Sequence, residues 1–323
     1  MTPFSPNIVT DLRSMWQYEF MRNAFEAGTV VAIVAGIIGY FVVLRRSAFA
    51  THALGHVGFS GAAGAVLFGV NPVYGLLLFT TGGGTGMALL GRRASTRDIE
   101  IGTVLAFMLG LGLIFLSLYN GYATEAYSIL FGEILGISNA SVLLTVEAGV
   151  LVIGVLLLMY RPLLFASLDE DVAEARGLPM LLINLVFMLL LAVAISFAVQ
   201  VVGVLLIFAL MVTPAATAVR ITRRPLYAIL VSASVALFSI WAGLFIAWYE
   251  QYPPSFFIVS TAFVIYLIVR AGPPVLGLFE RGVRYASRAA TVGTPPRFVP
   301  EASRSTDRAL VPPPSPADDP RSA

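Results

Sequence analysis

The sequence contains a succession of apolar segments, each close to the length of a helix that crosses a lipid bilayer. Hydrophobic residues make up 58% of the 323 residues and charged residues only 12%, whereas about a quarter of the residues of a soluble domain are charged. A helix needs roughly 20 apolar residues to cross the hydrocarbon core, and there the backbone must satisfy its own hydrogen bonds. The sequence therefore predicts an all-α polytopic membrane protein and excludes a soluble domain.

The apolar segments predict about nine transmembrane helices. We place them at approximately 24–44, 53–70, 72–90, 101–119, 141–160, 181–199, 202–219, 226–248 and 255–270. The stretch 181–219 is too long for one crossing, because at about 1.5 Å per residue it would be about twice as long as the hydrocarbon core is thick. A turn near Gln200–Gly203 divides it into two helices, and the count becomes eight if one of the pair is re-entrant.

The distribution of arginine predicts the orientation of the chain. Lysine is absent, so all 20 basic residues are arginine. Basic residues follow every second expected helix, at Arg45, Arg46, Arg92, Arg93, Arg97, Arg161, Arg176, Arg220, Arg223 and Arg224, and continue from Arg270 to the end. The loops between, at 71, 120–140, 200–201 and 249–254, contain none, and only Arg13 and Arg22 run against the pattern. The positive-inside rule places the N-terminus outside and the C-terminus in the cytoplasm.

Three regions follow from this pattern. Residues 1–23, which contain Trp16, Tyr18 and Phe20, form an expected interfacial N-terminal segment, since aromatic residues favour the membrane–water interface. Residues 24–271 form the membrane domain. Residues 272–323 form a cytoplasmic, Pro/Arg-rich and mostly disordered tail, in which a short arginine-bearing helix is expected at 277–290.

The only two histidines, His52 and His56, are spaced one helical turn apart in the second apolar segment. Residues four apart lie on one helix face, and Ser60 shares it. Ionisable groups at membrane depth usually mark a substrate or ion path, and imidazole suits zinc, copper, iron and nickel. The alternative is that both rings form hydrogen bonds to neighbouring helices. Cysteine is absent, so a metal site would rely on these two imidazoles together with other ligands.

Two features exclude enzymatic sites within this chain. Without lysine it has no Walker A loop, so nucleotide hydrolysis must come from a partner. The zincin motif H-E-x-x-H is also missing, because Ala53 follows His52. Gly82–Gly86 resembles a phosphate loop only superficially, and we expect close helix packing through Gly82 and Gly86 and through Gly61, Ala65 and Gly69.

Two further residues are candidates for a translocation path. Pro214 lies inside an expected helix and frees the carbonyl of Leu210, which either lines an ion path or reflects a helix kink. Glu133, in the outer segment beside Glu125, either attracts cations to an entrance or is an ordinary solvated carboxylate. Ser60 joins this group because it shares the histidine face.

The loop between the fifth and sixth expected helices predicts a short helix near 167–177. Ser167 and Glu170 have the spacing of a capping box, while Arg176 and Gly177 are typical of a helix end. A helix with both ends specified, outside the membrane, is a rigid projection that could transmit motion from a soluble partner. The alternative is a solvated connector.

Several motifs, in order, resemble the permease subunits of bacterial zinc, manganese and iron-uptake ABC transporters, over roughly residues 24–271. They are Arg45–Phe49 leading to His56 and Gly61, Asp98–Gly102, Leu130–Leu135, Val202–Leu206 and Pro214–Ala218. The resemblance implies a homodimer in the bacterial cell membrane that works with two cytoplasmic ATPase subunits and an external metal-binding protein. It implies no resident cofactor and no nucleic-acid partner.

The resemblance also assigns expected roles to residues. His56 corresponds to the family's histidine, whereas His52 stands where many members have an aspartate. Because a nitrogen replaces an anionic oxygen, zinc is expected over manganese or iron. The 167–177 helix becomes a coupling helix that docks on the ATPase, with Asp169, Glu170, Glu174, Arg176 and Gly177 as its candidate residues. The alternatives are a permease for manganese, iron or a chelated metal, and a secondary metal transporter that needs no ATP.

Overall fold

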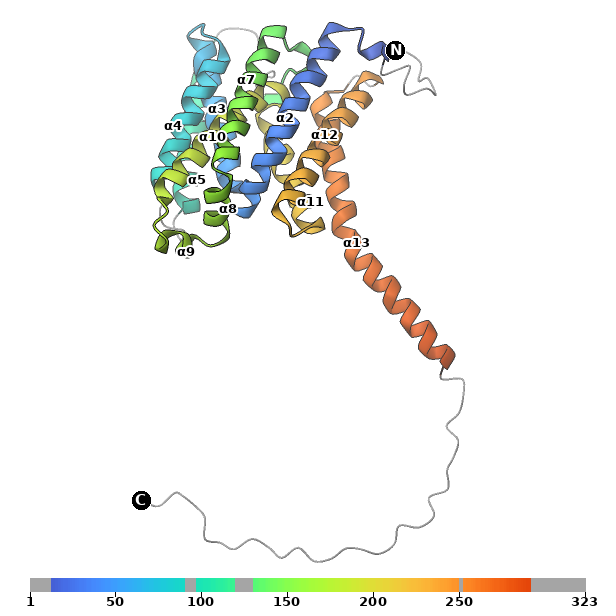
Figure 1. The fold of residues 1–323 in the computed structure, drawn as a ribbon. Helices are drawn as coiled ribbons and strands as arrows, with labels where there is room; N and C mark the ends of the chain where they lie inside the picture. The colour runs from blue at the N-terminus through green and yellow to red at the C-terminus, as the bar shows by residue number, and fades with distance from the viewer. Residues whose placement is uncertain (1–12, 91–96, 120–129, 250–251, 292–323) are drawn as a thin grey trace, which may run out of the picture. The chain divides into compact units, whose positions relative to one another are not determined.

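The computed structural model describes residues 13–90, 97–119, 130–249 and 252–291. The elements are α2 (Glu19–Leu44), α3 (Ala48–Leu67), α4 (Pro72–Leu90), α5 (Arg97–Leu118), the 3₁₀ turn η1 (Ile134–Gly136), α7 (Asn139–Leu158), α8 (Tyr160–Leu168), α9 (Glu170–Ala175), α10 (Met180–Val202), α11 (Val204–Ile221), α12 (Pro225–Tyr249) and α13 (Pro254–Thr291). The chain divides into two units, residues 1–274 and 275–323, and the first holds the helical bundle (Figure 1).

The long helices coincide with the expected apolar segments, which confirms the all-helical fold. Six of them are long and apolar enough to cross a membrane, namely α2, α5, α7, α10, α12 and the Pro254–Gly272 part of α13. Helix α11 is apolar but shorter. Helices α3 and α4 are not among the six, and their apolar residues are interrupted by histidine, threonine and glycine. The chain is thus a helical membrane protein, and the exact number of crossings and their orientation stay predictions.

The turn expected near Gln200–Gly203 is confirmed. Helix α10 ends at Val202 and α11 begins at Val204, with Gly203 between them at φ +90°. That left-handed backbone is readily available only to glycine. A single residue therefore separates the two helices.

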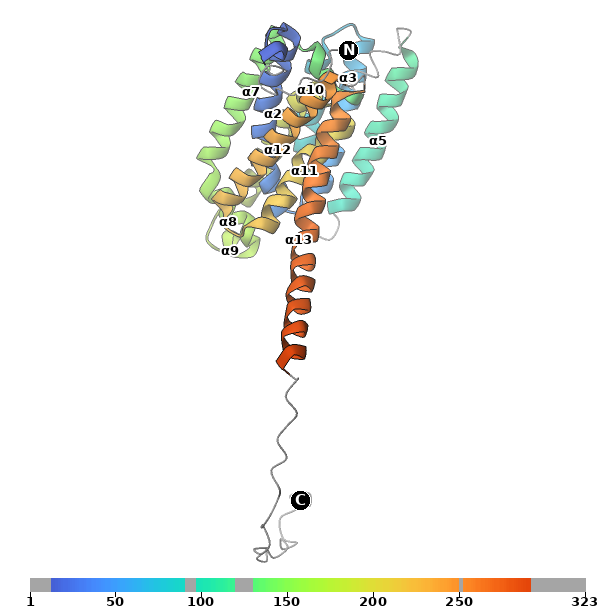
Figure 2. The same cartoon turned by 90° about the vertical axis from the view of Figure 1, so that its right-hand side faces the viewer.

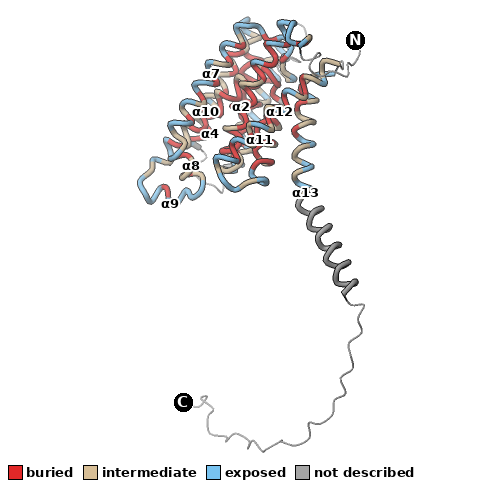
Figure 3. The backbone as a smooth tube through the Cα atoms, turned by 45° about the vertical axis from the view of Figure 1, so that its right-hand side comes forward, coloured by how far each residue is buried: buried red, intermediate tan, exposed pale blue. Residues whose placement is uncertain are grey.

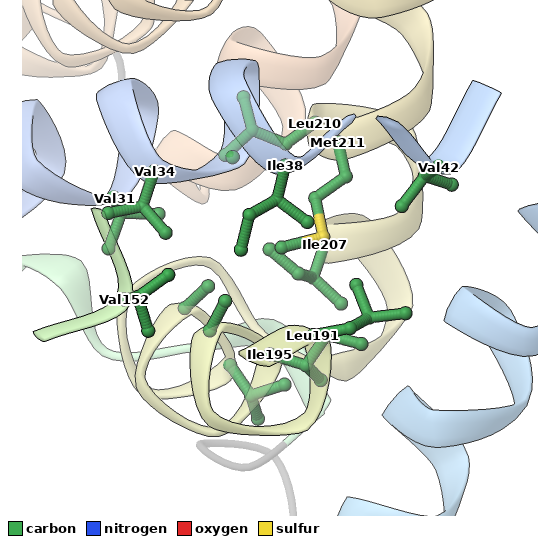
Figure 4. Packing of buried hydrophobic residues seen from close by; sticks show 14 of the residues in the cluster. Val31, Val34, Ile38, Val42, Val152, Leu191, Ile195, Ile207, Leu210 and Met211 are labelled. Atoms are coloured by element: carbon green, nitrogen blue, oxygen red, sulfur yellow. The ribbon is translucent and has the colours of Figure 1, made fainter. Parts of the chain in front are cut away.

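Helices α2 and α10 form the centre of the bundle, with α11 beside them. Figure 3 shows the buried backbone concentrated in these helices, and Figure 4 shows Ile38 of α2 beside Ile207 of α11, with Leu191 and Ile195 of α10 close by. All four side chains are at most 1% exposed. Lipid is as apolar as these residues, so the packing is maintained mainly by van der Waals contact.

Small residues bring several helices into backbone contact. A Cβ on Gly61 of α3 would lie 2.1 Å from the carbonyl oxygen of Gly75 in α4, and a Cβ on Gly39 of α2 would lie 2.1 Å from that of Met211 in α11. Thr80 of α4 and Ser196 of α10 share a buried hydrogen bond of 2.7 Å. Helices α3, α4 and α10 are thus joined by short-range contacts.

The expectation about the glycine stripes is right for Gly61 and wrong for Gly82 and Gly86. A Cβ on Gly82 or Gly86 would meet nothing within 4 Å, whereas one on Gly83 would meet Val57 at 2.9 Å. The α4 face that packs against α3 is therefore rotated by one residue from the predicted face. Gly69 serves the end of α3 at φ +68° rather than a helix contact.

The two ends of the bundle carry different loops. At one end lie the α2–α3 turn with Arg45, helices α8 and α9, and the end of α11 with Arg220 (Figure 1). At the other end the loop before α7 is held by hydrogen bonds from Asn23 to the Ile137 carbonyl, from Ser255 to the Phe131 carbonyl and from the Glu133 amide to the Gln200 carbonyl. The described arginine-bearing loops thus share one end.

The chain termini are partly outside the described residues. Residues 1–12 and 292–323 are not described, so the disordered tail and the first part of the interfacial segment stay predictions. The helix expected at 277–290 is continuous with the last apolar segment, since α13 runs from Pro254 to Thr291.

Helices α5 and α7 lie on opposite sides of the bundle (Figure 2).

Candidate metal site and coupling helix

The structure brings the two histidines together as the spacing predicts. The ring centroids of His52 and His56 lie 4.6 Å apart, with the ring planes at 84°. Both side chains are half-buried. They project from the first half of α3, which follows a tight turn in which Arg46 adopts φ +53°. Two imidazoles this close can bind one cation, because their nitrogens are metal ligands when neutral.

The first turn of α11 packs beside the histidine pair. The ring of Phe208 lies 5.3 Å from that of His52 in an edge-to-face arrangement. Between the histidines, a Cβ on Gly55 would lie 3.7 Å from both the Val204 carbonyl oxygen and a methyl group of Ile207. The pair therefore adjoins the point where α10 gives way to α11, a neighbourhood that sequence periodicity does not reveal.

No further protein ligand of the usual kinds joins the pair within the described residues. Among them, no group of three or more His, Cys, Asp or Glu side chains is placed to hold a metal ion. Two imidazoles are fewer than the ligands of a closed structural zinc site. An open, weakly ligated site suits an ion that must leave as well as arrive.

Ser60 lies one turn beyond His56 and joins α3 to α5. Its side chain is fully buried, and its hydroxyl lies within hydrogen-bond reach of the His56 carbonyl, at 3.2 Å, and of the Met108 carbonyl in α5. The hydroxyl has one proton to donate, and both acceptors belong to the helix backbone. This geometry gives Ser60 a place in helix packing, and its role in a path stays a prediction.

Pro214 is buried within α11, and the helix continues on both sides of it. Because proline has no amide hydrogen, the buried carbonyl of Leu210 lacks its usual helical donor. The adjacent Met211 carbonyl lies against Gly39 of α2. The segment is thus packed against α2, and its contribution to an ion path stays a prediction.

Glu133 is exposed in the loop directly before η1. Its amide donates to the Gln200 carbonyl at 3.1 Å, so the loop is attached to the last turn of α10. Glu125 lies outside the described residues. The expected role of Glu133 in attracting cations stays a prediction.

The short helix α9 forms where it is expected, but its cap differs from the prediction. Asp169 is the N-cap and accepts a hydrogen bond of 3.0 Å from the Val172 amide. Ser167 is not the cap, because it still belongs to α8, where its hydroxyl donates to the Leu163 carbonyl. The prediction of a Ser167/Glu170 capping box is therefore wrong.

The end of α9 follows the prediction closely. Gly177 adopts φ +81°, its amide donates to the Glu174 carbonyl at 2.9 Å, and the next amide donates to the Ala173 carbonyl at 3.2 Å. This pair of hydrogen bonds is the Schellman motif. Ala173 is fully buried, whereas the predicted docking residues Asp169, Glu170, Glu174, Arg176 and Gly177 are all exposed. The helix is a rigid, mainly acidic projection.

Comparison with known proteins extends this description. The sequence profile of the ABC 3 transport family matches residues 17–272. The chain is 30% identical over 268 residues to the manganese transport system membrane protein MntC of Listeria monocytogenes, covering 83% of this chain and 95% of that protein. It is 30% identical over 253 residues to the manganese import system permease protein ScaB of Streptococcus parasanguinis, covering 78% and 90%.

A solved structure has the same fold. PsaBC from Streptococcus pneumoniae in complex with Fab superposes with a TM-score of 0.73 at 28% identity, covering 81% of this chain and 95% of that chain. The histidine pair, the α10–α11 break and α9 all lie within the matched region 17–272. The chain therefore belongs to the ABC 3 transport family and is a multi-pass membrane permease of the metal-uptake ABC transporters, not itself an ATPase.

Proposed function

We propose that this permease carries manganese into a bacterial cell as part of an ABC importer. The named relatives transport manganese, and they favour this cargo over the zinc expected from His52. Two imidazoles alone do not select zinc, because the remaining ligands of the ion are supplied by other groups. Manganese lies at the weak-binding end of the divalent series, which suits an ion that has to be released.

The observation that carries the proposal is the His52–His56 pair on α3. The rings are 4.6 Å apart, half-buried, and inside the region matched by the family. If these two polar rings served only helix packing, the neighbouring helices would be expected to offer them hydrogen-bond partners. Phe208, the ring beside His52, has no such group to offer.

The partners in this proposal are a second copy of the chain, two cytoplasmic ATPase subunits and an external metal-binding protein. The arginine-bearing end of the bundle faces the cytoplasm under the positive-inside rule, which puts α9 on the side of the ATPase. Because most of α9 is exposed and both of its ends are capped, it presents a defined surface to the ATPase.

Uptake by the reconstituted permease–ATPase complex in proteoliposomes tests the proposal. We expect ATP-dependent Mn²⁺ uptake that His56→Ala reduces to the ATP-independent background, with membrane insertion and ATPase binding unchanged. Thr103→Ala, on an exposed face of α5, is the matched control and retains uptake. Full uptake by His56→Ala would exclude the histidine pair as the site, and uphill uptake without the ATPase would identify a secondary transporter instead.

A further inference from the structure

The turn between α2 and α3 rigidly joins the end of α2 to the histidine helix. Arg45 ends α2, and its amide donates to the Phe41 carbonyl at 2.9 Å. The Ser47 amide donates to the Val42 carbonyl at 2.9 Å, and the Ser47 side chain is 2% exposed. Helix α3 begins at Ala48, directly after this turn. Movement of Arg45 therefore moves the first turns of α3, which carry His52.

The Arg45 side chain reaches two other helices. Its Nη1 donates to the Ser167 hydroxyl of α8 at 3.4 Å, and its Nη2 donates to the Asn184 side-chain oxygen of α10. The guanidinium also lies 5.2 Å from the centre of the buried Phe187 ring, over its face. A planar guanidinium has several donors in a fixed fork and stacks on aromatic rings, so one side chain can hold three partners together.

The Ser167 contact lies at the base of α9. Ser167 belongs to the last turn of α8, and only Leu168 separates it from Asp169, the residue that caps α9. An open pocket of about 340 Å³ adjoins the contact, lined by Arg45, Arg46, Ser167, Glu170 and their neighbours. The base of α9 and the α2–α3 turn are therefore not fully packed against each other.

We propose that Arg45 is a positioning residue that transmits movement of α9 to the histidine helix. When α9 moves with the ATPase, the Ser167–Arg45 contact displaces the α2–α3 turn, and α3 changes the position of His52 and His56. The contacts with Asn184 and Phe187 carry the start of α10 along with the guanidinium during this movement. The inference rests on the proposed function, since it needs α9 to dock on an ATPase, and Arg45 itself does not bind the metal.

The number of Mn²⁺ ions transported per ATP hydrolysed by the reconstituted complex tests this role. We expect Arg45→Gln to lower the ratio about tenfold, a size typical of coupling between sites, while Mn²⁺ binding to the permease and assembly with the ATPase stay at wild-type levels. Ser167→Ala removes only one hydroxyl and is expected to lower the ratio without affecting folding. Arg161→Gln, which removes an exposed arginine from the same helix α8, is the control and keeps the ratio.

A double variant distinguishes transmission from general weakening. If Arg45 and Ser167 act through one contact, Arg45→Gln with Ser167→Ala has the ratio of Arg45→Gln alone. Independent falls that multiply in the double variant, a wild-type ratio in Arg45→Gln, or a loss of Mn²⁺ binding that parallels the loss of transport would each overturn the inference. The wild-type complex separates the two levels, because absence of its ATP-driven uptake refutes the proposed function and not only the role of Arg45.

Discussion

Gly132 and Gly203 contact each other through their backbones, at the junction between the loop before η1 and the α10–α11 break. A Cβ on Gly132 would lie 2.6 Å from the Gly203 nitrogen, and a Cβ on Gly203 would lie 2.4 Å from the Phe131 carbonyl carbon. Both residues adopt positive φ, +78° and +90°. The loop therefore holds the start of α11, which packs against Gly55 between the two histidines.

Gly203→Ala is expected to destabilise the protein and to reduce Mn²⁺ uptake. Gly203 has φ +90° and ψ 159°, a region essentially restricted to glycine that costs a residue with a Cβ about 1–3 kcal/mol, and here the Cβ also meets backbone atoms that cannot rotate away. Thermal unfolding of the purified protein measures the effect. Gly154→Ala in α7, where a Cβ meets nothing within 4 Å, is the control and leaves stability unchanged or raises it slightly. Equal stability of the two variants would contradict this account.

Zinc is expected to inhibit manganese uptake, and His52→Asp is expected to weaken that inhibition. Zn²⁺ binds nitrogen ligands more tightly than Mn²⁺ does, so the imidazole pair holds Zn²⁺ longer. A carboxylate at position 52 favours Mn²⁺ because this ion prefers oxygen ligands. The Zn²⁺ concentration that halves Mn²⁺ uptake is the measurement, with His52→Ala as the control that removes the ligand without supplying an oxygen. Tighter inhibition in His52→Asp would refute the role given to His52.

Glu174→Gln combined with Gly177→Ala is expected to uncouple ATP hydrolysis from transport. The alanine forces a Cβ onto a residue at φ +81° and disturbs the Schellman motif, while the glutamine removes an exposed charge from α9. Binding of the ATPase to the permease should weaken, with Mn²⁺ binding unchanged. Ala175→Ser, also exposed on α9, is the control. Full coupling in the double variant would exclude α9 as the docking helix.

Ser60→Ala is expected to lower stability by roughly 0.6 kcal/mol, the average value of a hydrogen bond between membrane helices, and to leave Mn²⁺ uptake intact. The hydroxyl lies against the Met108 carbonyl of α5, which assigns it to helix packing. Parallel unfolding and uptake measurements distinguish the two roles. Reduced uptake at unchanged stability would place Ser60 in the ion path instead.

Local signals in the sequence predicted most of the fold. Helix positions follow from apolar length, the break at Gly203 from the excess length of one apolar stretch, and the end of α9 from Gly177. The sequence does not predict the cap of α9, because Ser167 and Asp169 both suit an N-cap and only the length of α8 decides between them. The histidine pair was predictable because four-residue spacing fixes relative position on a helix.

Contacts between distant segments could not be predicted. The Gly132–Gly203 contact depends on the packing of the whole bundle, and nothing in the sequence near Arg45 indicates that its side chain reaches Ser167 and Asn184. The sequence marks this arginine only as one of the charges that orient the chain and as the start of the Arg45–Phe49 motif. The face of α4 that packs against α3 differs by one residue from the expected face, because a stripe of adjacent glycines offers several equivalent surfaces.

The backbone contact between Gly61 and Gly75 has a mechanical consequence. The Gly75 carbonyl oxygen lies 2.1 Å from where a Cβ on Gly61 would be, so the two backbones are in direct contact. Helices α3 and α4 must therefore move as one block. The Thr80–Ser196 hydrogen bond links α10 to this block. Any rocking that opens the histidines first to one side of the bilayer and then to the other must therefore move α4, α10 and, through the Ser60–Met108 contact, α5 together with α3, relative to α11.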